Sequence, residues 1–222
     1  MSYDNRGTIV SNRIYWLFSI LDTPTYDEVA PKIAYWIELA LTQQLTTVDQ
    51  LVEHVSRIAW TRHSSASFAR FLQEFRDSPR RSAQARSFVI DLCTRIFRWF
   101  AAASTEDLVT DWNSCSVAMN GGCGFVEAAS SVGNLTECGL LDHGLVRLHL
   151  IKPLTAHYYS SPETLAEPVR ANAICQLFAV AGSTLVHGLL EPEDVQVCFE
   201  LLEIHLSRYG MTMGLSRTKL EV

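Results

Sequence analysis

The chain has 222 residues, of which 48% are hydrophobic and 19% charged, and its formal net charge is −6 at pH 7. This length is enough for one large domain with a continuous core, and the composition excludes an intrinsically disordered chain. A membrane span and a signal peptide are not expected, because no apolar stretch approaches about 20 residues and the first residues carry charges instead of an apolar run.

The cysteines favour a reducing compartment. There are six of them, widely spaced and without a C-x-x-C pair, at Cys93, Cys115, Cys123, Cys138, Cys175 and Cys198. Without a secretion signal, thiols packed as small hydrophobic side chains are a simpler interpretation than a disulfide framework. We therefore expect a cytoplasmic protein, with the nucleus as the alternative.

Apolar residues recur at helical spacing along almost the whole chain, which predicts an all-α fold. The first helix is expected over residues 9–21. Thr23 is expected to cap the second helix, with Pro24 at its first position, where the missing N–H has no cost. Pro31 falls inside this second helix and should kink it.

Two more helices follow in the first third of the chain. Thr47 and Gln50 form a capping box, which predicts the start of a third helix that is expected to run through Trp60. The fourth helix is expected over residues 65–76, where the apolar spacing is again helical.

The fifth helix is predicted to be a long one. Ser78 followed by Pro79 is expected to open it, since serine is a good N-cap and proline suits the first helical position. Its apolar stripe consists of Phe88, Leu92, Ile96, Trp99 and Phe100. Ser104 is expected to cap a shorter sixth helix.

The second half of the chain opens with the one long predicted loop, over residues 112–124, which is rich in asparagine and glycine. Helices are expected next over residues 125–138, 143–159 and 169–185. Pro192 is expected to begin the last helix, and Gly210 to end it as a left-handed cap.

About ten helices would pair into about five antiparallel hairpins of roughly 44 residues each, which is the period of HEAT-type repeats. We therefore predict a single domain over residues 1–222, built as a HEAT-like α-α superhelix. A non-repetitive helical bundle is the alternative, because no strict internal sequence repeat is visible.

Motifs for catalysis are missing from the sequence, which has no phosphate-binding loop, dinucleotide fingerprint, H-E-x-x-H or G-x-S-x-G. Cys123, just before a predicted helix, is a candidate nucleophile, although an incidental cysteine is the simpler interpretation. His143, His149 and His157 fall on one predicted helix, at spacings that give no shared face for a metal ion. We therefore expect no enzyme, no cofactor and no metal site.

Positive charge is concentrated in one segment. Residues 57–98 hold nine of the 18 basic residues, and all nine are arginine, the residue suited to bidentate contacts with phosphate or carboxylate. The candidate binding residues for RNA or an acidic protein are Arg62, Arg76, Arg80, Arg81, Arg95 and Arg98. Two alternatives stay open: internal pairs such as Asp91 with Arg95, or pairs with acidic residues of neighbouring hairpins.

Three segments resemble the MIF4G domain, the helical middle domain of the eukaryotic translation-initiation scaffold. They are residues 19–29, 130–146 and 170–185, the last with Cys175, Leu177, Phe178 and Gly182 in the family's pattern. The resemblance implies a right-handed HEAT-like stack that serves as a docking platform in RNA metabolism. RNA, DEAD-box helicases and other assembly factors are the partners it implies.

The expected function is that of a non-catalytic scaffold for protein–protein interaction in mRNA metabolism or translation, with RNA or helicase contact as one form of it. A structural subunit that forms homo-oligomers through exposed helix faces is one alternative. An all-α enzyme with a pocket inside the bundle, using Cys123 or a histidine, is another. No membrane contact is expected.

Overall fold

The computed structural model describes residues 5–57, 65–102, 124–141, 146, 167–186 and 192–209. Within these ranges the chain forms eight α-helices and no strand, which confirms the prediction of an all-α protein. The helix predicted after Ser104 lies outside the described residues, as does the helix predicted over 143–159 apart from residue 146. The loop predicted at 112–124 also lies outside them, apart from its last residue.

The first two helices, α1 (Asn5–Ser19) and α2 (Tyr26–Thr42), form a helical hairpin. The connection contains a single 3-10 turn, η1 (Thr23–Thr25), in which the backbone N–H of Thr23 donates to Asp22 Oδ1 at 2.7 Å. Asp22 is thus the N-cap of this turn, and Thr25 is the N-cap of α2. The prediction that Thr23 caps the second helix was wrong, because the 3-10 turn separates Thr23 from the start of α2. Pro31 lies inside α2, which continues past it to Thr42.

The capping box predicted at Thr47 is confirmed at the start of α3 (Val48–Val55). The backbone N–H of Gln50 donates to Thr47 Oγ1, and the N–H of Thr47 donates to Gln50 Oε1, both at 3.2 Å. Each side chain thus satisfies a backbone donor that a helix start leaves free. The next helix, α4 (Ser65–Asp77), lies where it was predicted.

The start of α5 (Ala83–Ala102) differs from the prediction. The backbone N–H of Ser78 donates to Glu74 O at 3.2 Å, so Ser78 closes α4 instead of opening α5. Ser82 is the cap, because its Oγ accepts the N–H of Ala85 at 3.1 Å. The same serine donates to the carboxylate of Glu38 on α2, through its N–H at 3.2 Å and its Oγ at 3.0 Å.

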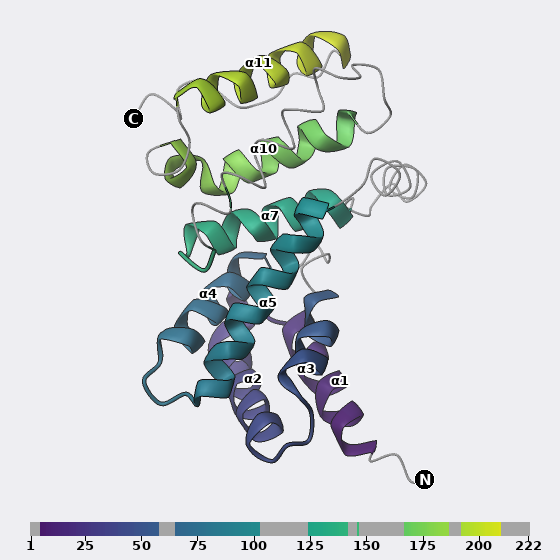
Figure 1. Ribbon diagram of the computed structural model, residues 1–222, viewed down its shortest axis with the longest axis vertical. Helices are drawn as coiled ribbons and strands as arrows, with labels where there is room; N and C mark the ends of the chain where they lie inside the picture. The colour runs from purple at the N-terminus through teal and green to yellow at the C-terminus, as the bar shows by residue number, and fades with distance from the viewer. Residues whose placement is uncertain are drawn as a thin grey trace.

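The remaining described helices are α7 (Gly124–Glu137), α10 (Glu167–Thr184) and α11 (Pro192–Tyr209). Helix α7 packs against α4 and α5 on one side and against α10 on the other, and α11 packs against α10. The helices therefore follow one another in a column, with α1–α5 at one end and α11 at the other (Figure 1).

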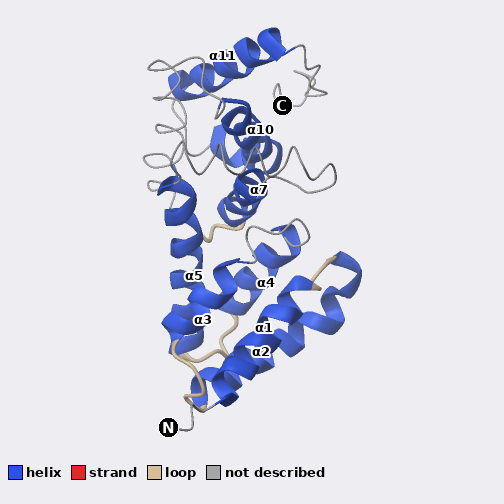
Figure 2. Cartoon of the chain, turned by 90° about the vertical axis from the view of Figure 1, so that its right-hand side faces the viewer, coloured by secondary structure: helices blue, strands red, loops and turns tan. Residues whose placement is uncertain are grey.

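One contiguous apolar cluster runs through the described part of this column, from Val10 to Cys198. Near its N-terminal end, the ring of Phe18 lies edge-on to those of Phe68 and Phe71, with centroids 5.3 and 5.4 Å away, and so joins α1 to α4. Among the described helices, none has the length and hydropathy that a membrane span requires. A view from the side shows the same column, with α7 between the two groups of helices (Figure 2).

Candidate interaction surface

The arginine-rich segment lies on α4, on α5 and just after α3, so the structure describes most of the predicted surface. Arg62 lies outside the described residues. The other five candidates divide into three that contact neighbouring groups of the same chain and two whose side chains extend into solvent.

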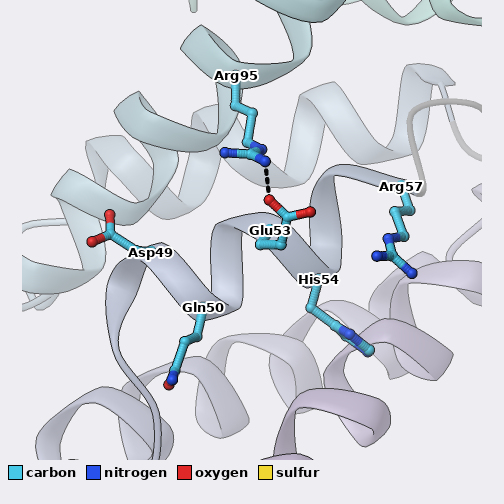
Figure 3. A pocket seen from close by; sticks show the side chains of 6 residues that line it. All are labelled: Asp49, Gln50, Glu53, His54, Arg57 and Arg95. Atoms are coloured by element: carbon cyan, nitrogen blue, oxygen red, sulfur yellow. Dashed lines mark hydrogen bonds and ion pairs between the residues drawn. The ribbon is translucent and has the colours of Figure 1, made fainter.

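Arg95 projects from α5 to the carboxylate of Glu53 on α3 and forms an ion pair with it (Figure 3). The pair predicted inside α5, between Asp91 and Arg95, is not the one in the structure. Asp91 instead accepts a hydrogen bond from Ser87 Oγ at 3.1 Å. The alternative that arginines pair with acids of a neighbouring helix therefore holds for Arg95.

Arg76 connects α4 with the end of α7. Its Nε lies 2.8 Å from Asp77 Oδ1, and its Nη1 donates to the carbonyl oxygen of Gly139 at 3.0 Å. Gly139 has a φ of +62°, and its N–H donates to Thr136 O, as in a helix C-terminus closed by a left-handed residue. Arg76 is thus a structural residue of the α4–α7 contact.

Arg81 covers the edge of the core. Its guanidinium lies over the ring of Phe75, 4.6 Å from the centroid, and its Nε is buried without a hydrogen-bond partner among the described residues. Such a cation–π contact uses the guanidinium face as packing surface. Arg80 and Arg98, by contrast, are exposed and form no ion pair with a described residue. The five described candidates therefore do not form one free cationic patch.

A shallow groove of about 410 Å³ lies beside the Arg95–Glu53 pair, between α3 and α5 (Figure 3). It is lined by Asp49, Gln50, Glu53, His54, Arg57 and Arg95. Two carboxylates and two guanidinium groups balance one another in it, so the groove suits a polar chain of mixed charge better than a polyanion. Sequence reasoning missed this groove, because the contact between α3 and α5 has no local signal.

His54 closes the inner side of the groove. Its ring lies edge-on to that of Tyr15 on α1, with 5.3 Å between centroids, and its Nε2 is buried without a described partner. Burial, and then the positive charge of Arg57, lower the pKa of His54. The imidazole is therefore neutral at pH 7 and contributes packing, with no charge to offer a ligand.

The structure does not describe the candidate residues for catalysis or metal binding, which are Cys123, His143, His149 and His157. Among the described thiols, burial raises the pKa of Cys93 to about 12 and that of Cys175 to about 11, so neither is a thiolate nucleophile at neutral pH. In the part of the chain that the structure describes, no three His, Cys, Asp or Glu side chains come together as metal ligands would.

Comparison of the chain with protein-family models, with curated proteins and with solved structures found no match.

Proposed function

We propose that the chain is a non-catalytic helical scaffold that binds protein partners, and that it is a HEAT-like stack related to the MIF4G domain. The observation that carries this proposal is the column of helices, in which α7 packs on α4 and α5, α10 on α7, and α11 on α10 (Figure 1). Columns of this kind leave long helix faces exposed along their length, and stacked-helix proteins use such faces to bind partners.

The relation to the MIF4G domain has support from two of the three segments that resemble it. Residues 130–146 begin on α7, and residues 170–185 lie mostly on α10. The two helices pack closely at Gly133, where a Cβ atom would lie 3.1 Å from Cβ of Val180. Neighbouring hairpins of a stack would bring these segments together in the same way.

The arginine-rich segment favours a protein partner over RNA. Arg76 and Arg95 already hold carboxylates, and Arg81 lies on Phe75, so these three offer no free cation to a phosphate backbone. The groove between α3 and α5 presents both signs of charge, as the polar rim of a protein interface commonly does. DEAD-box helicases are the partner class that the resemblance implies.

The test of the scaffold function is affinity purification of the full chain from its native host, followed by reconstitution with the purified partner. A partner that co-purifies in near-stoichiometric amount and binds again as a pure protein, measured by calorimetry, supports the scaffold. Recovery of the chain alone as a defined homo-oligomer would instead support the structural subunit. Recovery of a monomer without any partner would refute the scaffold.

RNA contact is a second candidate, favoured by Arg80, Arg86 and Arg98, which are exposed and form no ion pair with a described residue. Titration of a labelled single-stranded RNA at 50 to 200 mM salt tests it, because each neutralised phosphate contributes a log–log salt slope of about −0.7. Arg98→Glu should weaken binding, and Lys32→Glu on α2, with the same change in charge, should not. A flat salt response would exclude RNA.

A further inference from the structure

Helix α1 carries apolar residues on its buried face and also on the exposed surface beside that face. The buried face packs into the core through Val10, Ile14, Leu17 and Phe18, each at most 7% exposed. Beside it Ile9 is 60% exposed and Trp16 57%, and Ile20, just past the helix end, is 37% exposed. Spacings of seven and four residues place these three side chains in one stripe along the helix.

Arg13 completes this stripe, since it lies four residues after Ile9 and three before Trp16. Its guanidinium lies over the ring of Trp36 on α2, 4.9 Å from the centroid. Tyr35, 60% exposed, lies edge-on to Trp36 at 5.7 Å. The stripe thus continues onto the second helix, and we call Ile9, Arg13, Trp16, Ile20, Tyr35 and Trp36 together the α1–α2 face.

Single exposed apolar side chains are ordinary on protein surfaces, but a cluster of them marks an interaction site. Six large hydrophobic residues are exposed in the described part of the chain, and four of them belong to the α1–α2 face. The hairpin that carries them lies at one end of the column (Figure 2). An exposed apolar cluster of this kind indicates a surface that is covered by another molecule.

The charges on α1 indicate the chemistry of the covering molecule. The helix contains Arg6 and Arg13 and no acidic residue. Arg13 contacts Trp36 by its face and forms no ion pair with a described residue, so its charge is available to a carboxylate. A second copy of the chain docked α1 against α1 would offer Arg13 no carboxylate, because α1 contains no acidic residue. An anionic membrane is disfavoured as well, because only two basic residues accompany the stripe and the whole chain carries −6.

We propose that the α1–α2 face is the docking site for an amphipathic helix of a partner protein, which places an apolar stripe against Ile9, Trp16 and Ile20 and a carboxylate against Arg13. Recognition of a helix by apolar anchors at i, i+4 and i+7 spacing is a recurrent mode of protein binding. This inference rests on the proposed scaffold function and names the kind of segment that the partner must contain.

The experiment uses the full chain and a displayed library of 20-residue helical peptides. Each peptide carries leucine at its heptad a and d positions, and the flanking positions vary among Glu, Lys and Gln. The wild-type chain should enrich Glu-flanked peptides. Arg13→Glu should reverse the preference towards Lys-flanked peptides, with roughly tenfold weaker binding of the Glu-flanked ones, because one attractive charge pair becomes repulsive.

Three variants distinguish binding at the α1–α2 face from non-specific binding to exposed apolar side chains. Trp16→Glu and the milder Trp16→Gln should abolish enrichment, whereas Ile90→Glu on α5, at a position that is 58% exposed, should leave it intact. All variants should keep the helical circular dichroism of the wild type, because each replaced side chain lies at the surface. No enrichment, or enrichment that Trp16→Glu leaves unchanged, would overturn the inference.

Two further outcomes would also overturn it by naming another occupant. Concentration-dependent dimerisation in sedimentation velocity that Trp16→Glu abolishes would assign the face to a second copy of the chain. Trp16-dependent binding to vesicles of phosphatidylcholine with phosphatidylserine would assign it to a membrane. A partner captured equally well by wild type and Trp16→Glu would refute the docking site and leave the scaffold function standing, whereas capture of no partner at all would refute the scaffold.

Discussion

The hydrogen bonds between Glu38 and Ser82 should couple the two residues energetically. Ser82 caps α5 through the N–H of Ala85, and Glu38 accepts from both the N–H and the Oγ of that serine. Hydrogen bonds to a charged acceptor contribute about 1.5–3 kcal/mol each when buried, and the half-buried position of Glu38 reduces this. We expect Glu38→Ala to lower the free energy of unfolding by about 2 kcal/mol, and Ser82→Ala by about 1 kcal/mol.

Substitution of Ser82 by aspartate gives the sharper result. On an isolated helix aspartate is as good an N-cap as serine. Here its carboxylate would face that of Glu38, and two like charges this close repel each other, so Ser82→Asp should destabilise the wild type by about 1–2 kcal/mol. In a Glu38→Gln background the amide can donate to the new carboxylate, and the same substitution should be neutral or stabilising.

Urea unfolding followed by circular dichroism measures all of these free energies in one double-mutant cycle. Contacting residues should deviate from additivity by more than about 0.5 kcal/mol. Additive effects of Glu38→Ala and Ser82→Ala, or a Ser82→Asp variant that is stabilised in both backgrounds, would refute the contact between Glu38 on α2 and Ser82 at the start of α5.

Three other predictions concern single positions. Gly7→Ala should lower stability by about 1–3 kcal/mol in urea unfolding, because its Cβ would clash with the carbonyl oxygen of Leu45, and an unchanged midpoint would contradict this contact. Cys93 should resist iodoacetamide at pH 8 in the folded chain, as measured by mass spectrometry, because burial raises its pKa to about 12; labelling as fast as in urea would contradict that burial. Burial raises the pKa of Glu74, but hydrogen bonds from Tyr26 and Arg70 outweigh burial and leave the pKa lowered. The carboxylate of Glu74 therefore stabilises the fold fully above its unfolded pKa, and this contribution is lost as the pH falls through its folded pKa. Between about pH 5 and 3 the wild type should therefore lose up to about 1 kcal/mol more than Glu74→Gln, and equal losses would exclude this contribution.

The helices could be predicted from the sequence wherever a hydrophobic period and its cap are close together in the chain. Thr47 and Gln50 carry their whole capping interaction within four residues, so the start of α3 was predicted correctly. The prediction of the start of α5 was wrong because Ser78 and Ser82 are equally good local N-caps. The residue that decides between them is Glu38, which lies 44 positions before Ser82.

The same limit applies to the candidate site. Asp91 was the local partner for Arg95, but the actual partner, Glu53, lies 42 positions away on another helix. The concentration of arginine was evident from composition, whereas the fate of each guanidinium depends on contacts such as that of Arg76 with Gly139, which no local pattern encodes. Charge density along a chain therefore predicts where a surface is basic, and only the packing of helices determines how much of that charge is free.

The close contact of α7 with α10 has a consequence for how the chain folds as it is synthesised. Helices α1–α5 can pack together, and α7 can add to α4 and α5, before α10 has left the ribosome. The surface of α7 around Gly133 has no packing partner until Leu177 and Val180 of α10 have been synthesised, more than 40 residues later in the sequence. At about 5–20 residues per second this interval lasts some seconds. For that time the nascent chain exposes a narrow apolar strip on a partly assembled fold, so α7 is a place where a chaperone could bind.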